Sequence, residues 1–176
     1  MEEKNRTKGP IRASNLDGHF RSEVLRHEEA SGLNACFSCG ACTAGCPIAE
    51  IFPEYSPRKL AKMVKLGMKI DVLSSPYIWY CVTCHNCEQH CPQNVKFFKI
   101  LNVLKNMAAE QGYVPTPWVK QTQQIMKTGL IFSVDEVLVK KRQSFSLPTL
   151  KSDGKKVKKL IQLAGLDKIK PKKKTE

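Results

Sequence analysis

The sequence of 176 residues lacks any long hydrophobic run. No apolar stretch approaches the roughly 18–20 residues that a membrane-spanning helix needs, so the sequence predicts no membrane span. The N-terminus reads Met-Glu-Glu-Lys-Asn, without the apolar stretch that a secretory signal peptide carries. These absences favour a cytoplasmic protein, in which eight cysteines are better suited to metal binding than to disulfides.

Motifs of nucleotide-binding and hydrolytic enzymes are also missing. Segment 40–45 is rich in small residues but lacks the lysine and hydroxyl residue of a phosphate-binding loop, and no G-x-G-x-x-G sequence occurs. There is no G-x-S-x-G nucleophile elbow and no H-E-x-x-H zinc motif. The sequence therefore predicts no substrate site on this chain, and its chemistry has to come from the cysteines.

Acidic residues are scarce, with 16 against 29 lysines and arginines, which gives a formal net charge of +13. Such an excess would indicate nucleic-acid binding if it were spread over a folded face. Residues 151–176 contain ten lysines and only three acidic residues, so more than half of the excess belongs to this segment. We interpret it as a solvated tail, or one that docks on an acidic partner, and expect no nucleic-acid binding.

Strand patterns are nearly absent, and helical patterns predominate, so the predicted fold class is mostly α. The clearest helix is 94–111, where apolar residues recur at helical spacing and Gly112 is expected to end the helix. Three Ser/Thr-Pro pairs, at Ser56, Ser75 and Thr116, predict further helix starts. Weaker patterns predict helices in 16–31, after a capping box that begins at Ser133, and in about 154–164.

These patterns suggest three parts of the chain. Residues 1–15 are polar and are expected to form a flexible N-terminal arm. Residues 16–145 contain most predicted helices and all cysteines, and are expected to form one domain. Residues 146–176 are expected to be a flexible basic C-terminal tail.

All eight cysteines lie in two runs with one shared spacing. Residues 36–47 and 81–92 both read C-x2-C-x2-C-x3-C-P, forty-five residues apart. Three cysteines at this spacing can surround one iron–sulfur cubane. In the bacterial two-cluster pattern the fourth cysteine, before proline, ligates the other cubane.

The sequence thus predicts two [4Fe–4S] clusters with crossed ligands. The first cluster would be bound by Cys36, Cys39, Cys42 and Cys91, and the second by Cys81, Cys84, Cys87 and Cys46. Soft thiolates suit such clusters, and the small residues of the first run let backbone N–H groups approach the cluster sulfurs. His85 and His90 lie within the second run, but eight thiolates already fill the ligand positions, so we expect neither to be a ligand.

Zinc is the main alternative to iron–sulfur clusters. Structural zinc sites use two C-x2-4-C pairs separated by a longer loop. A cysteine triplet with a fourth cysteine before proline, present twice, is a better match to cubanes. A disulfide framework is disfavoured because nothing in the sequence indicates secretion.

The two cysteine runs, with the segment Tyr55-Ser-Pro-Arg-Lys59 between them, resemble the C subunit of heterodisulfide reductase over residues 16–145. The cysteine motifs alone occur in many oxidoreductases, but no [2Fe–2S] domain, membrane segment or cysteine-rich catalytic domain accompanies them here. The resemblance implies an α-helical ferredoxin-like domain with two crossed [4Fe–4S] sites. It also implies a complex with a flavin-containing A subunit and a catalytic B subunit that reduces the coenzyme M–coenzyme B heterodisulfide.

Two clusters without a substrate site indicate a non-catalytic electron-transfer subunit of an oxidoreductase. By the resemblance, it relays electrons from the flavin-containing subunit to the catalytic subunit in a hetero-oligomeric complex of methanogenesis. Relay in a different complex, quinone-linked or sulfur-metabolising, is one alternative. A zinc-stabilised nucleic-acid-binding module is a more remote one.

Overall fold

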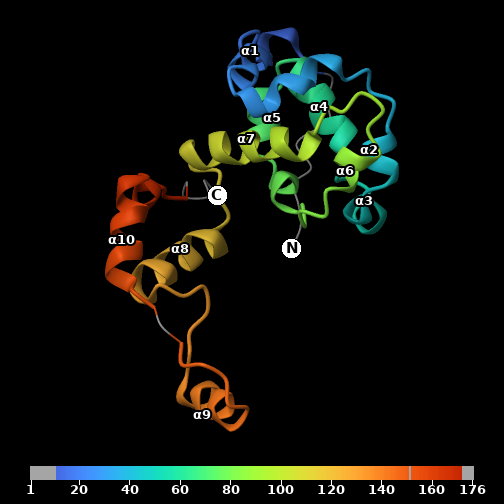
Figure 1. Cartoon of the computed structure of the whole chain (residues 1–176). Coiled ribbons are helices and arrows are strands. Elements are labelled where there is room, and N and C mark those ends of the chain that lie inside the picture. The colour runs from blue at the N-terminus through green and yellow to red at the C-terminus, as the bar shows by residue number, and fades with distance from the viewer. Residues whose placement is uncertain (1–10, 151, 172–176) are drawn as a thin grey trace. The chain divides into compact units, whose positions relative to one another are not determined.

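The computed structural model describes residues 11–150 and 152–171, and every regular element in this part of the chain is helical, which confirms the mostly-α class. The α-helices are α1 Phe20–Leu25, α2 Ala41–Ala44, α3 Pro47–Ile51, α4 Pro57–Lys65, α5 Lys69–Leu73, α6 Asn86–Gln89, α7 Phe97–Glu110, α8 Thr116–Thr128, α9 Glu136–Ser144 and α10 Gly154–Leu163 (Figure 1). Short 3-10 helices are η1 Ala13–Asn15, η2 Glu28–Ala35, η3 Pro76–Trp79 and η4 Leu166–Lys168. Among the described helices, none combines the length and the apolar character that crossing a membrane requires.

The chain divides into two units, Met1–Ala108 and Ala109–Glu176, and both cysteine runs lie in the first. This grouping differs from the boundary expected near residue 145. The reason is that α10 packs along α8 in the second unit and buries Ile161. The expected tail therefore contains a packed helix, at nearly the residues of the weak pattern in 154–164. Residues 1–10 and 172–176, which belong to the expected arm and tail, lie outside the described residues.

Helix α7 supplies much of the core of the first unit. Its fully buried side chains include Ile100, Leu101 and Leu104. Burial on such a wide face matches the broad apolar pattern of the sequence and marks a central helix. The helix starts three residues later than expected because Asn94 and Lys96 have left-handed φ angles of 50° and 53°. Gly112, with φ 79°, follows the helix as predicted.

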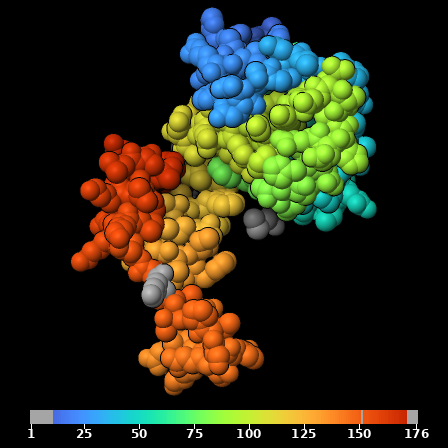
Figure 2. Space-filling model, in the orientation of Figure 1, coloured from blue at the N-terminus to red at the C-terminus, as the bar shows by residue number. Residues whose placement is uncertain are grey.

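The helix expected in 16–31 is two elements, α1 and the 3-10 helix η2. Both bury apolar side chains, among them Phe20 and Leu33. Gly32 approaches the second cysteine run closely, because a Cβ built on it would lie 2.7 Å from the carbonyl oxygen of Val95. In Figure 2 the blue residues of α1 and η2 lie against the yellow-green residues that follow the second run. The segment before the first run thus packs on the segment after the second.

Helix caps set the start of α4 and of α9. Ser56 caps α4 as predicted, with its Oγ accepting the Lys59 N–H at 3.2 Å. The capping box expected from Ser133 is wrong. Helix α9 begins at Glu136, so Asp135 is its N-cap and accepts the Leu138 N–H at 2.7 Å.

Candidate metal centre

Each cysteine run folds in the same way, as a loop followed by a one-turn helix. In the first run the loop leads into α2, and in the second into α6. Left-handed φ angles recur at equivalent positions, at Ser38 and Gly40 in the first run and at Thr83 and His85 in the second. Backbone turns of this kind point successive N–H groups into a concavity, an arrangement found in iron–sulfur sites. The sequence repeat is therefore also a repeat of backbone conformation.

The two loops pack directly on each other. Helix α2 contacts α6. The side-chain amide of Asn86 donates to the carbonyl of Gly45 at 3.2 Å, and a Cβ on Gly45 would lie 3.2 Å from the ring of His90. A larger residue than glycine would separate the loops, so this contact helps to bring the cysteines of both runs together.

The first group of cysteines lines one pocket, formed by Cys36, Cys39, Cys42 and Cys91 together with Cys87 and apolar residues that include Val95 and Phe97. Burial raises the pKa of the Cys42 thiol, and a hydrogen bond from Thr43 lowers it. The neighbouring sulfurs of Cys36, Cys39 and Cys91 raise this pKa further. Cys91, from the other run, thus lies with the three cysteines predicted to share its cluster.

Three cysteines of the second group lie near the buried phenol of Tyr55, which is only 2% exposed. Burial raises the pKa of Tyr55 above its ordinary value, and Cys81, Cys46 and Cys87 raise it further. Cys46, from the first run, therefore lies near the same tyrosine as two of its predicted partners. The fourth, Cys84, lies in the same loop as Cys81 with an exposed side chain.

The two groups of cysteines lie close to each other. Burial and the nearby Cys81 raise the pKa of Cys87 to about 12, the Phe98 N–H opposes this, and smaller contributions come from Glu88 and Cys42. Because Cys42 belongs to the first group and Cys87 to the second, the sulfurs of the two groups lie within each other's electrostatic reach. Cys87 also lines the pocket of the first group.

Backbone N–H groups donate to sulfurs of both groups. Val95 N–H donates to Cys91 Sγ at 3.3 Å, and Thr83 N–H donates to Cys81 Sγ at 3.5 Å. Such donors stabilise thiolates and tune the potential of a bound cluster. The soft sulfur ligands, the N–H donors and the apolar lining fit iron–sulfur clusters.

Within residues 11–150 and 152–171, no three histidine, cysteine, aspartate or glutamate side chains are arranged to hold a single metal ion. This finding concerns one shared ion position. In a cubane each thiolate binds a different iron, so the four sulfurs need not converge on one point.

Sequence reasoning did not predict that Tyr55 and Lys105 lie near the cysteines. Tyr55 lies in a segment that only the family resemblance connects to function, and nothing local indicates that it lies near Cys81. Lys105 of α7 is half-buried, and burial lowers its pKa while the nearby Cys81 opposes the change. The His85 ring packs on Phe98 with centroids 4.2 Å apart, and its Nδ1 lies 3.1 Å from a carboxylate oxygen of Glu88.

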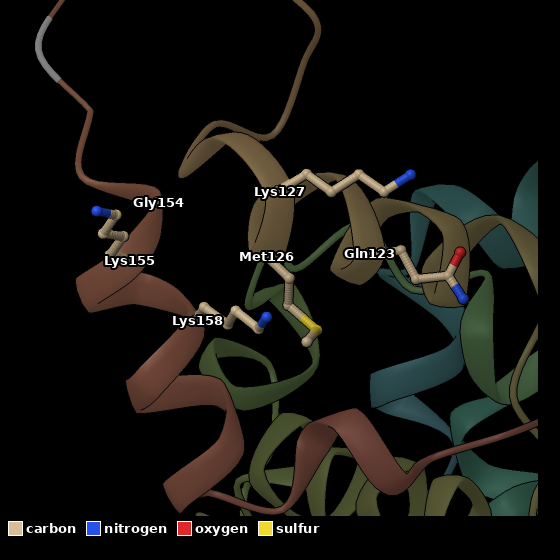
Figure 3. Close-up of a pocket in the computed structure, with 6 residues that line it drawn as sticks. All are labelled: Gln123, Met126, Lys127, Gly154, Lys155 and Lys158. Carbon is tan, nitrogen blue, oxygen red and sulfur yellow. The ribbon is translucent and has the colours of Figure 1, made fainter.

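The second unit contains a different kind of cavity, between α8 and α10, with a volume of about 500 Å³. It is lined by Gln123, Met126, Lys127, Gly154, Lys155 and Lys158, and Figure 3 shows that its side chains come from both helices. Its lining contains three lysines and no cysteine. Part of the charge excess of the terminal segment is therefore displayed on a packed helix.

Known proteins with similar sequences point to one family. Residues 32–95, which contain both cysteine runs, match the family described as 4Fe-4S dicluster domain. The C 2 iron-sulfur subunit of the CoB–CoM heterodisulfide reductase of Methanocaldococcus jannaschii is 32% identical over 153 residues, covering 83% of this chain and 81% of the relative. The C subunit of the H(2):CoB-CoM heterodisulfide,ferredoxin reductase of Methanothermobacter thermautotrophicus is 28% identical over 166 residues, covering 90% and 89%.

A shorter match has a higher identity. The C subunit of the ferredoxin:CoB-CoM heterodisulfide reductase of Methanosarcina acetivorans is 44% identical over 88 residues, covering 50% of this chain and 35% of the relative. Because similarity extends over most of the chain and the dicluster match contains both cysteine runs, the chain belongs to the family of heterodisulfide reductase C subunits, with an iron–sulfur electron-transfer role.

Proposed function

We propose that this chain is the electron-relay subunit of a heterodisulfide reductase complex and binds two [4Fe–4S] clusters. Cys36, Cys39, Cys42 and Cys91 hold one cluster, and Cys81, Cys84, Cys87 and Cys46 hold the other. The observation that carries the proposal is the exchange of the fourth cysteines, since Cys91 lines the pocket of the first group and Cys46 lies near the same buried tyrosine, Tyr55, as Cys81 and Cys87.

The residues of the chain bind the two clusters, shield them from water and adjust their reduction potentials. Each bound [4Fe–4S] cluster takes up and releases one electron, while the protein supplies ligands and placement. Clusters bind deprotonated thiols, and burial raises the pKa of the Cys42 and Cys87 thiols. Val95, which is 4% exposed, and Phe97, which is 3% exposed, shield the first site from water.

The partners follow from the family. A flavin-containing A subunit donates electrons, and a catalytic B subunit reduces the coenzyme M–coenzyme B disulfide. Splitting a disulfide into two thiols consumes two electrons and two protons, so the relay delivers two electrons in single steps. This chain carries no recognisable substrate motif, and we assign it no catalytic role of its own.

An exposed apolar segment in the second unit supports assembly with another protein. Helix α9 buries none of its residues, and a free helix of this length is unstable in water. Large apolar side chains are exposed throughout the segment: Ile131, Phe132, Val137, Leu138, Val139, Phe145, Leu147 and Leu150. Contiguous exposed apolar surface of this kind marks interaction sites.

Purification of the native complex under anaerobic conditions tests the partner assignment. We expect the chain to co-purify with a flavin-containing subunit and a catalytic subunit. Replacing Phe132 and Val137 by serine, which removes two of the most exposed apolar side chains of that segment, is expected to weaken recovery of the complex at least tenfold, because about 1.4 kcal/mol of lost contact suffices.

The matched control replaces Leu160 and Leu163 of α10, which are also exposed, by serine. This variant should assemble normally. Recovery of the chain with quinone-linked or sulfur-metabolising enzymes instead would contradict the heterodisulfide reductase assignment and favour a relay in a different complex.

A further inference from the structure

Helix α4 lies along the loop of the first cysteine run. At its first turn it contacts α2, and the Arg58 N–H donates to Thr43 Oγ1 at 3.0 Å. At its last residue the Lys65 ammonium donates to the carbonyl of Cys36, the first cysteine of the run. Arg58 and Lys65 are seven positions apart, which is about two helical turns, so they share one face of α4. This face is directed at the first run.

The Arg58 side chain lies at the pocket of the first group of cysteines. It lines this pocket together with Cys39 and Cys42. A Cβ built on Gly40, which stands between these two cysteines, would lie 3.5 Å from Arg58 Cδ and 3.8 Å from Arg58 Nε and Nη1. The guanidinium is therefore close to the backbone of the loop that carries three predicted ligands of the first cluster.

No carboxylate neutralises these two cations within residues 11–150 and 152–171, where neither Arg58 nor Lys65 forms a salt bridge. The carbonyl that Lys65 contacts is uncharged, so the ammonium keeps its full charge beside Cys36. Lys65 is partly buried, which reduces the screening of its charge by water and salt, whereas Arg58 is exposed. The first run therefore lies in a positive field that its own residues do not supply.

From this placement we infer that Arg58 and Lys65 raise the reduction potential of the first cluster, an inference that rests on the two-cluster function proposed above. Reduction adds one negative charge to the cluster and its thiolates. A nearby unpaired cation stabilises the reduced form more than the oxidised form, and net charge is one of the properties that set cluster potentials. The first cluster thus accepts an electron at a higher potential than the same site would without the two cations.

The test is an anaerobic redox titration of the full chain with both clusters bound, followed by EPR. Cys39→Ser identifies the signal of the first cluster by its loss, whichever run supplies the fourth ligand. Lys65→Met is expected to lower the midpoint potential of this cluster. The ratio of reduced to oxidised cluster at a fixed potential should change about tenfold, which is about 59 mV for a one-electron couple. Arg58→Gln should lower it less, with about a threefold change, because water screens the exposed guanidinium.

Three control variants separate the charge of these residues from their packing. Lys65→Arg and Arg58→Lys retain the charge and should keep the potential of the first cluster close to that of the wild type. Lys59→Gln removes an exposed charge of the same helix from a residue that does not line the pocket, and should shift neither cluster measurably. The second cluster should shift less than the first in Lys65→Met and in Arg58→Gln.

Unchanged potentials in both neutral variants, equal shifts of the two clusters, or charge-retaining variants that shift as far as the neutral ones would overturn the inference. If Lys65→Met lost the first cluster, Arg58→Gln would decide, since a lowered potential supports the inference and an unchanged one overturns it. A wild-type chain without EPR signals of reduced clusters would instead refute the two-cluster function. The two failures are therefore distinguishable in one set of samples.

Discussion

Replacing Cys91 by serine is expected to eliminate the cluster bound by Cys36, Cys39 and Cys42, while the cluster of Cys91's own run remains. In the structure Cys91 lines the pocket of these three cysteines, and the Val95 N–H donates to its sulfur. A serine oxygen is a harder and poorer ligand for iron–sulfur clusters than a thiolate. About half of the bound iron should therefore be lost, and EPR of the reduced protein should retain the signal of one cluster.

The reciprocal variant is Cys46→Ser. Because Cys46 lies near Tyr55 together with Cys81 and Cys87, this change should remove the cluster of the second run and spare that of the first. The two variants should retain different EPR signals, which also assigns the signals to the two sites. If each variant lost the cluster of its own run, the crossed ligand scheme would be wrong.

Gly67→Ala is expected to destabilise the first unit by about 3 kcal/mol. Gly67 has a φ of 77°, where an L-residue costs roughly 1–2 kcal/mol. A Cβ at this position would also lie 2.4 Å from the carbonyl oxygen of Asp17, whose N–H donates to the Gly67 carbonyl at 2.7 Å. The backbone would have to shift, at a further cost of about 1–3 kcal/mol. The denaturation midpoint of the cluster-loaded chain, followed by circular dichroism, measures the loss.

Gly18→Ala is the matched control, since it lies in the same unit and a Cβ there meets no atom within 4 Å. Its stability should stay within about 0.5 kcal/mol of the wild type. Equal midpoints for Gly67→Ala and the wild type would show that the close approach of Gly67 to Asp17 is absent in solution.

Local sequence patterns predicted those features that depend on nearby residues. The cap at Ser56, the end of α7 shortly before Gly112 and the start of α8 at Thr116 follow from residues within one turn of each helix end. The shared spacing of the two cysteine runs, combined with the two-cluster pattern, led to the prediction that Cys91 is a ligand of the first cluster, and Cys91 lines a pocket with the cysteines of the first run. The ligand assignment itself stays a prediction.

Features that depend on distant parts of the chain were not predictable in this way. Tyr55 lies near Cys81 although the two residues are twenty-six positions apart, and Gly32 approaches Val95 although the two cysteine runs lie between them in the sequence. The packing of α10 was not predicted because its lysines suggested a solvated tail. In the structure α10 packs on α8 in the second unit and buries Ile161. No local pattern specifies such partners.

Iron and acid-labile sulfide per chain in the anaerobically purified protein test the central claim most directly. Two [4Fe–4S] clusters predict about eight irons and about eight sulfides per chain, with broad absorbance near 400 nm. A colourless protein that contains zinc and no sulfide would contradict the electron-relay account.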